Sequence, residues 1–373
     1  METRLLASVP QQQRTAALRR FARLMPTRLT TLLRVLVPAV AIAGTLMTGG
    51  CASPETGQSN RSQQTIQIGP QGARYPFVVF ANHDLQASEA QIEQAVVILH
   101  GVKRNADTYF ATGRKLLKLA QLPNQRTLLL APNFLTEADR RASNDLPLWR
   151  KDNWMQGEPS GFGLGGVSSF QALDDVVRYL ADRQRFPALK RITLIGHSAG
   201  AQLMQRYAVL NPQDEGLRQS GIAIRYVISS PSTYVYFDAN RPQAQGFAPV
   251  VSIMCPSYNR YRYGIDAAPA YLQVQHLSAE QLFRRYAGRD VTYLVGSKDN
   301  DPANRIMDKS CGAGMQGATR VERQLNYLAY ERFLGQHWNI AVQHPQFQVP
   351  GIGHSANGLY TSPLTAERLF PAR

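Results

Sequence analysis

The sequence predicts one α/β domain built on a mainly parallel sheet with helices on both faces. Short apolar runs rich in β-branched residues recur along the chain, and segments with helical periodicity separate most of them. The runs are almost continuously apolar, which is typical of strands buried on both faces. The fifth run also leads through a tight turn, Gly196–Gly200 (GHSAG), straight into a helical segment. This alternation of strand and helix favours a parallel sheet over an antiparallel one.

The elements follow in chain order. Eight strands are expected, at residues 65–68, 77–80, 95–99, 127–130, 192–195, 222–228, 291–295 and about 344–349. Helices are expected at residues 109–120, 167–184, 199–209, 279–286 and 317–334. A long segment rich in aromatic residues, about 234–285, separates the sixth strand from the seventh.

The N-terminal segment has the pattern of an export signal. A basic stretch precedes an apolar run at 35–47, which is shorter than the ~20 residues a membrane span needs. Small residues then lead to Cys51, and the whole resembles a bacterial lipoprotein signal in which this cysteine is lipidated. Cleavage near Ala52 by an ordinary signal peptidase is the alternative. Residues 25–51 alone make a signal of normal length, so Met25 is an alternative start.

We therefore expect a signal peptide at 1–51, a flexible tether at 52–64 and the folded domain at 65–373. The expected location is the bacterial periplasm or cell envelope, where a lipid anchor is the only membrane contact expected. Secretion into the medium is the alternative. In such an oxidising compartment Cys255 and Cys311 form an even pair, which favours a disulfide over two free thiols.

The charge and composition exclude several classes of function. The formal net charge is +15, but the first 50 residues contribute +6 of it and leave +9 for the rest. No basic run with interleaved aromatic residues marks a nucleic-acid site, so no nucleic-acid partner is expected. Neither Cys255 nor Cys311 has zinc-type spacing to another ligand, and the glycines at 161–166 follow no buried strand. We expect no metal and no cofactor.

The turn at Gly196–Gly200 has the G-x-S-x-G form of a nucleophile elbow. Such a turn holds its serine, here Ser198, in a strained conformation with Oγ above the sheet. The following helix begins beside the serine, where its free N–H groups favour a developing oxyanion. A serine hydroxyl is a weak nucleophile and needs a general base within hydrogen-bond reach.

Over roughly residues 65–365 the chain resembles an α/β hydrolase, whose functional residues follow particular strands. The turn His100-Gly101-Val102 follows the third strand, Ser198 the fifth, the 296–302 loop the seventh and His354 the eighth. The resemblance implies Ser198 as nucleophile, His354 as base, and the amides of Val102 and Ala199 as oxyanion donors. Asp299 is the expected acid, with Asp301 as the alternative two residues on. Hydrolases of this kind often carry a lid between the sixth and seventh strands, here about 234–285.

The expected function is that of an exported serine hydrolase that cleaves a small or polymeric carboxylic ester through an acyl-enzyme. The chain resembles the polyhydroxybutyrate-depolymerase and feruloyl-esterase-like branch of the superfamily. A peptidase or a thioesterase on the same triad is the first alternative, and a non-catalytic envelope binding protein with a hydrolase fold is the second. Trp154, after the fourth strand, and Tyr234, at the start of the lid segment, are expected to contact substrate.

Overall fold

A computed structural model describes residues 62–250, 253 and 255–371. Contacts divide the chain into two units, Met1–Ser53 and Pro54–Arg373, and every described residue belongs to the second. The expected signal segment, the proposed lipidation at Cys51 and nearly all of the expected tether lie outside the described residues. Strand β1 begins at Gln63, two residues before the expected start of the domain.

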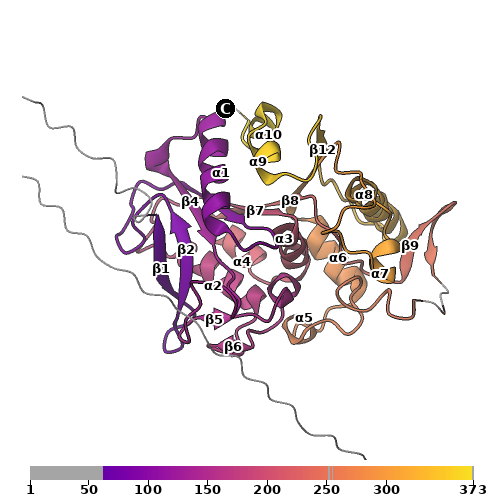
Figure 1. Ribbon diagram of the computed structural model, residues 1–373, viewed down its shortest axis with the longest axis horizontal. Coiled ribbons are helices and arrows are strands. Elements are labelled where there is room, and N and C mark those ends of the chain that lie inside the picture. The colour runs from indigo at the N-terminus through magenta and orange to yellow at the C-terminus, as the bar shows by residue number, and fades with distance from the viewer. Residues whose placement is uncertain (1–61, 251–252, 254, 372–373) are drawn as a thin grey trace, which may run out of the picture. The chain divides into compact units, whose positions relative to one another are not determined.

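The centre of the described unit is an eight-stranded sheet in the order β1-β2-β4-β3-β7-β8-β11-β12 (Figure 1). Its strands are β1 Gln63–Ile68, β2 Tyr75–Ala81, β3 Gln94–Leu99, β4 Thr127–Pro132, β7 Arg191–His197, β8 Ala223–Ser229, β11 Asp290–Gly296 and β12 Gln346–Val349. Strand β2 is antiparallel to both β1 and β4, and all other neighbours are parallel. All eight expected strands are confirmed, and so is the expected fold class.

The described helices are α1 Ala106–Leu119, α2 Ser169–Ala181, α3 Ala199–Leu210, α4 Asp214–Gln219, α5 Ala270–Gln273, α6 Ala279–Ala287, α7 Cys311–Gly314, α8 Arg320–His337, α9 Ala356–Tyr360 and α10 Pro363–Leu369. Short 3-10 turns occur at Asn124–Arg126 and Asn153–Gln156. Two small ribbons, β5 Pro147–Leu148 with β6 Phe162–Gly163 and β9 Asn240–Gln243 with β10 Gly246–Pro249, lie outside the main sheet. The five expected helices are confirmed, with ends shifted by a few residues.

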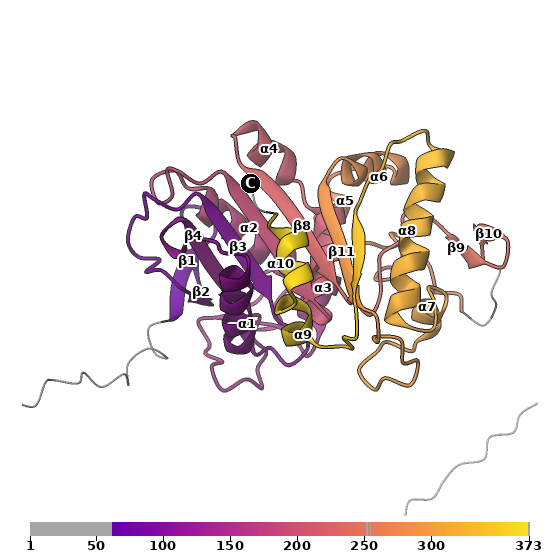
Figure 2. The same ribbon diagram turned by 90° about the horizontal axis from the view of Figure 1, so that it is seen from above.

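Alternate residues of the central strands enter two separate cores, one on each face of the sheet. Val96 and Ile98 of β3 pack with α1, α9 and α10, whereas Ala95 and Val97 pack with α2, α3, α6 and α8. Figures 1 and 2 show these two groups of helices on opposite sides of the sheet. Because both faces are covered, the central strands can be apolar throughout.

The segment after β8 is packed into the fold over much of its length. It begins with Tyr234 and Tyr236, both fully buried, and continues through the β9–β10 hairpin, α5 and α6. The hairpin lies beside α8 in both ribbon views, and its Phe247 ring is 5.3 Å from that of Phe333. The hairpin therefore packs on α8 through an apolar side chain, and the expected lid at about 234–285 stays a prediction.

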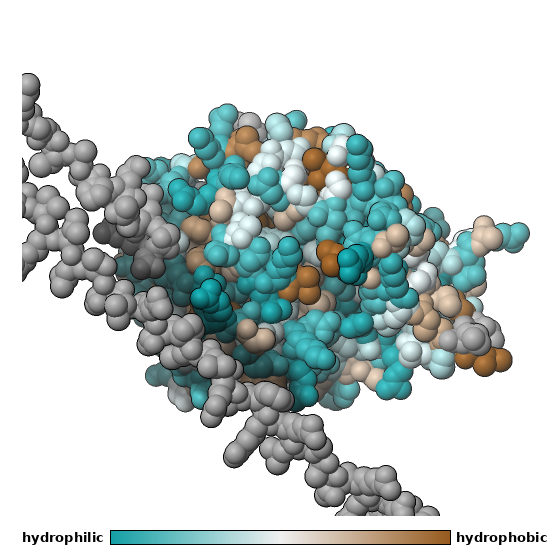
Figure 3. All heavy atoms as spheres, viewed as in Figure 1, coloured by the Kyte–Doolittle hydropathy of each residue, from teal (hydrophilic) through white to brown (hydrophobic). Residues whose placement is uncertain are grey.

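The visible surface is mainly hydrophilic, with hydrophobic residues in small groups between polar ones (Figure 3). Such scattered apolar residues are ordinary for a folded domain in water. Among the helices of residues 62–371, none combines the length and the hydropathy needed to cross a membrane.

Candidate active site

Ser198 lies in the turn between β7 and α3 in a strained backbone conformation. Its φ of 58° and ψ of −118° fall in a region that residues with a side chain rarely adopt. The glycines on either side make the turn possible. A Cβ at Gly196 would lie 2.3 Å from the carbonyl oxygen of Gly200, and one at Gly200 would lie 2.5 Å from that of His100. Steric exclusion of a Cβ therefore explains why glycine occupies the first and last positions of the G-x-S-x-G pattern.

The structure brings Ser198, His354 and Asp299 together from three separate loops. The Nε2 atom of His354 is 2.9 Å from Ser198 Oγ, and its Nδ1 atom is 2.7 Å from Asp299 Oδ2. The loops after β11 and β12 touch directly, since the Lys298 amide donates to the Ile352 carbonyl at 2.8 Å. This geometry lets His354 accept a proton from Ser198 while Asp299 holds the opposite nitrogen.

The two candidate acids, Asp299 and Asp301, differ in burial and in hydrogen-bond partners. Asp299 is buried, whereas Asp301 is exposed, and its carboxylate accepts from the amide of Ala303 at 2.8 Å in its own loop. Burial by itself would raise the pKa of Asp299. The hydrogen bond and charge of His354 and the charge of Arg320 outweigh burial, so the pKa ends below its usual value. Asp299 is therefore ionised at neutral pH.

The turn after β3 presents its backbone beside Ser198. His100 accepts from the Phe134 amide at Nε2, so Nδ1 carries the proton and donates to the Gly101 carbonyl at 2.9 Å. Burial lowers the pKa of His100 to about 4, which keeps the ring neutral. In the described chain, neither the Val102 nor the Ala199 amide donates to a protein acceptor. Neither amide is thus committed to an acceptor within the described chain, and their role as oxyanion donors stays a prediction.

The ring of His197 packs against that of His354, a contact that the sequence pattern does not indicate. Its ring centroid is 4.7 Å from that of His354, and its Nδ1 atom is 2.9 Å from Tyr109 Oη. Burial, together with the facing His354, lowers the pKa of His197 well below its usual value. The neutral ring packs against His354 and fixes its plane without adding a charge.

Trp154 and Tyr234 are not where substrate could reach them, which corrects the expectation for both. Trp154 is fully buried, stacked on Phe134 at 5.6 Å and edge-on to His100 at 4.7 Å. Tyr234 is fully buried and stacked on Tyr327 at 4.5 Å. Each aromatic ring packs into the apolar core beneath its loop, because burying that area stabilises the fold more than exposing it.

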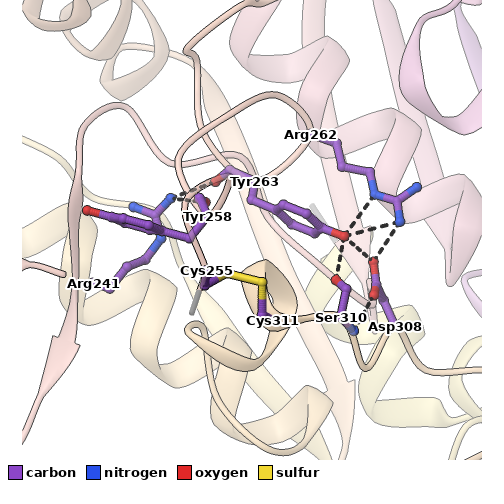
Figure 4. The surroundings of a disulfide bond; sticks show 8 residues. All are labelled: Arg241, Cys255, Tyr258, Arg262, Tyr263, Asp308, Ser310 and Cys311. Atoms are coloured by element: carbon purple, nitrogen blue, oxygen red, sulfur yellow. Dashed lines mark hydrogen bonds and ion pairs between the residues drawn. A yellow bond between two sulfur atoms is a disulfide. The ribbon is translucent and has the colours of Figure 1, made fainter. Parts of the chain in front are cut away.

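The predicted disulfide between Cys255 and Cys311 is confirmed, and Figure 4 shows its surroundings. It ties the segment after β8 to α7, which follows the acid loop. Beside it, Asp308 accepts from Arg262 at 3.0 Å and from Tyr263 Oη at 2.9 Å. The covalent bond and these polar contacts fasten the same two segments, so they restrict the loop that carries Asp299.

No group of three or more His, Cys, Asp or Glu side chains in the described ranges is arranged to hold a metal ion. The site brings together a serine hydroxyl, an imidazole and a carboxylate in hydrogen-bonded sequence. A set of groups in this arrangement can perform acyl transfer.

Comparison with known proteins gives structural relatives only. No model of a known protein family matches the sequence, and no curated protein matches it. The structure of poly(aspartic acid) hydrolase-1 from Sphingomonas sp. KT-1 is similar at 19% sequence identity and a TM-score of 0.55, covering 80% of this chain and 95% of that one. The poly(3-hydroxybutyrate) depolymerase LpqC from Bordetella parapertussis is similar at 18% identity and a TM-score of 0.58, covering 83% and 91%. Structural similarity at this level of sequence identity establishes the fold alone.

Proposed function

We propose that this chain, which has the α/β-hydrolase fold, is an exported serine hydrolase that cleaves carboxylic esters. The observation that carries the proposal is the continuous hydrogen-bonded line from Ser198 Oγ through His354 to Asp299. A structural serine in a loop needs neither a strained φ nor a half-buried imidazole hydrogen-bonded to its oxygen.

The reaction follows from the positions of these groups. His354 Nε2 takes the proton of Ser198 as Oγ attacks the ester carbonyl, and the resulting oxyanion is held by the Val102 and Ala199 amides. His354 then gives the proton to the leaving alcohol, which leaves an acyl group on Ser198. Water, activated by the same imidazole, releases the acid and restores the serine. Asp299 remains ionised throughout and stabilises the imidazolium.

The substrate class is proposed as a small or polymeric ester. One of the similar structures is by its printed name a depolymerase of poly(3-hydroxybutyrate), which is a polyester. An ester is also a less demanding substrate than an amide for this set of groups, because an alcohol leaves more readily than an amine.

Export is proposed from the sequence of residues 1–51, with lipidation of Cys51 as the mode of anchoring. The Cys255–Cys311 disulfide is consistent with an oxidising compartment such as the periplasm. Mass spectrometry of the mature protein from a bacterial host should find an acylated N-terminal Cys51. A free N-terminus beyond residue 51 would contradict lipidation.

The test of the activity is hydrolysis of a panel of p-nitrophenyl esters of graded acyl length, with a matched amide and a matched thioester. The wild type should hydrolyse at least one ester faster than either analogue, and Ser198→Ala should lose the activity by at least ~10³-fold. Thioester preference, amide preference or equal rates for Ser198→Ala would each contradict the proposal.

A further inference from the structure

The Asp299 carboxylate has a second partner that the proposed triad does not include. Its Oδ2 atom faces His354, while Oδ1 accepts from Arg320 Nη1 at 3.1 Å. Arg320 is the first residue of α8, which begins at the N-cap Thr319. The first residue of α8 thus places a guanidinium next to Oδ1 of Asp299, the oxygen that does not face His354.

This ion pair is deeply buried on both sides. The side chains of Arg320 and Asp299 are 1% and 3% exposed, and Nε and Nη2 of Arg320 have no partner in the described chain. A buried guanidinium with unpaired nitrogens costs free energy, and a buried ion pair is at best weakly stabilising compared with apolar side chains of the same volume. Stability alone therefore gives a poor reason for an arginine at this position.

Arg323, one turn further along α8, shows what a structural arginine looks like in the same surroundings. It is equally buried, yet it donates to the backbone carbonyls of Gly317, Ser232 and Asp308. Arg323 therefore fastens loops together and touches no member of the proposed triad. The two arginines share a helix and a degree of burial, so they form a matched pair for experiment.

The other titratable groups around Asp299 carry no charge that could replace that of Arg320. His354 and His197 face it from the β12 loop and the end of β7, and Tyr234 faces it from the segment after β8. Burial lowers the pKa of His197 and raises that of Tyr234, so both side chains stay neutral. Arg320 is the one cation bonded to Asp299 among the described side chains, apart from His354 when protonated.

We propose that Arg320 is a positioning residue for the reaction, acting through Asp299. It fixes the carboxylate so that Oδ2 points at His354, and it keeps that carboxylate ionised. The inference rests on the proposed function, since it concerns the same triad. Loss of Arg320 leaves Oδ1 buried without its donor and removes a positive charge from beside the Asp299–His354 pair.

The experiment measures kcat and KM for a p-nitrophenyl ester from pH 5 to 9 in the wild type, Arg320→Met, Arg320→Lys and Arg323→Met, with thermal melts to verify folding. In Arg320→Met the acidic limb of the kcat profile should move up by about one pH unit and kcat should fall by at least about tenfold. KM should change little, since Arg320 touches no substrate. Arg320→Lys should restore the position of the limb, and Arg323→Met should leave it unmoved.

A double variant keeps the test open if Arg320→Met does not fold. Replacing both members of a buried ion pair is tolerated better than removing one, so Asp299→Asn/Arg320→Met is expected to fold. The proposal predicts that its kcat is no lower than about a third of that of Asp299→Asn alone, because Arg320 acts only through the side chain at position 299. A further tenfold loss in the double variant would overturn it.

The remaining outcomes separate this inference from the proposed function. If the wild type hydrolyses the ester and the profile of Arg320→Met superimposes on it, only the role of Arg320 is refuted. An equal shift in Arg323→Met would also refute it, because that arginine does not contact Asp299. A wild type without hydrolytic activity would refute both the function and the inference.

Discussion

Replacing Asp299 by asparagine should disable the base while leaving its surroundings in place. The two carboxylate oxygens accept from His354 at 2.7 Å and from Arg320 at 3.1 Å. An asparagine has only one oxygen, and a guanidinium can only donate. The amide oxygen should therefore face Arg320, and the amide NH₂ group should face Nδ1 of His354.

That arrangement selects the wrong tautomer of the imidazole. With Nδ1 accepting from the amide, the ring proton moves to Nε2, which then points at Ser198 Oγ and cannot take its proton. A wrong tautomer of this kind lowers kcat by ~10⁴-fold, which corresponds to about 5 kcal/mol of activation free energy. KM should change little, because the acid does not contact the ester.

The assay is the initial rate of p-nitrophenyl ester hydrolysis near neutral pH, with Asp301→Asn as the matched control. Asp301 is exposed and its carboxylate accepts from the Ala303 amide, which an asparagine oxygen can also do, so this variant should stay within about twofold of the wild type. The reasoning is refuted if a folded Asp299→Asn protein keeps more than a tenth of the wild-type kcat, or if Asp301→Asn loses as much.

Three further predictions concern the fold. Replacing Cys255 and Cys311 by serine opens a loop with a sequence separation of 56 and should lower the free energy of unfolding by about 4 kcal/mol in urea titrations; an unchanged midpoint would contradict this. Gly196→Ala places a Cβ 2.3 Å from a backbone carbonyl oxygen and should lower the free energy of unfolding by about 3 kcal/mol, with loss of activity. A variant as stable as the wild type would show that the turn can move to accommodate a Cβ. His344 pairs with the buried Glu331 at 2.9 Å; burial opposes protonation of His344, but the carboxylate outweighs it and raises the pKa. The stabilisation from this pair should be complete below the unfolded pKa of about 6.5 and be lost as pH rises through the folded pKa, so the Tm of the wild type should fall over that range more than that of His344→Gln.

The sheet and the cluster of Ser198, His354 and Asp299 could be predicted because local sequence patterns mark the strands and the turn. Strands buried on both faces must be apolar runs, and the elbow requires glycine at Gly196 and Gly200 for steric reasons. The parallel topology then brings the ends of β7, β11 and β12 to one edge, where Ser198, Asp299 and His354 meet. The positions of the candidate residues after particular strands follow from the resemblance to α/β hydrolases.

The contacts that depend on tertiary packing could not be predicted. Arg320 lies 21 residues from Asp299 and begins a helix whose rotation the sequence leaves open. Trp154 and Tyr234 stand close to the site in the chain, but which side of a loop enters the core depends on its neighbours. The four-residue α7 is too short for a hydrophobic period to reveal it.

The sequence alone could not decide between Asp299 and Asp301, for a different reason. Two carboxylates two residues apart in one loop have nearly the same local sequence signal. Their difference is burial against His354 and Arg320, which only the folded chain provides.

The central claim is that Ser198 forms a covalent intermediate, and the most direct measurement locates the adduct of a fluorophosphonate by tandem mass spectrometry. The wild-type protein should carry one label, on Ser198, and His354→Ala should label far more slowly because the hydroxyl has lost its base. An unlabelled wild type, or a label on any other residue, would contradict the account.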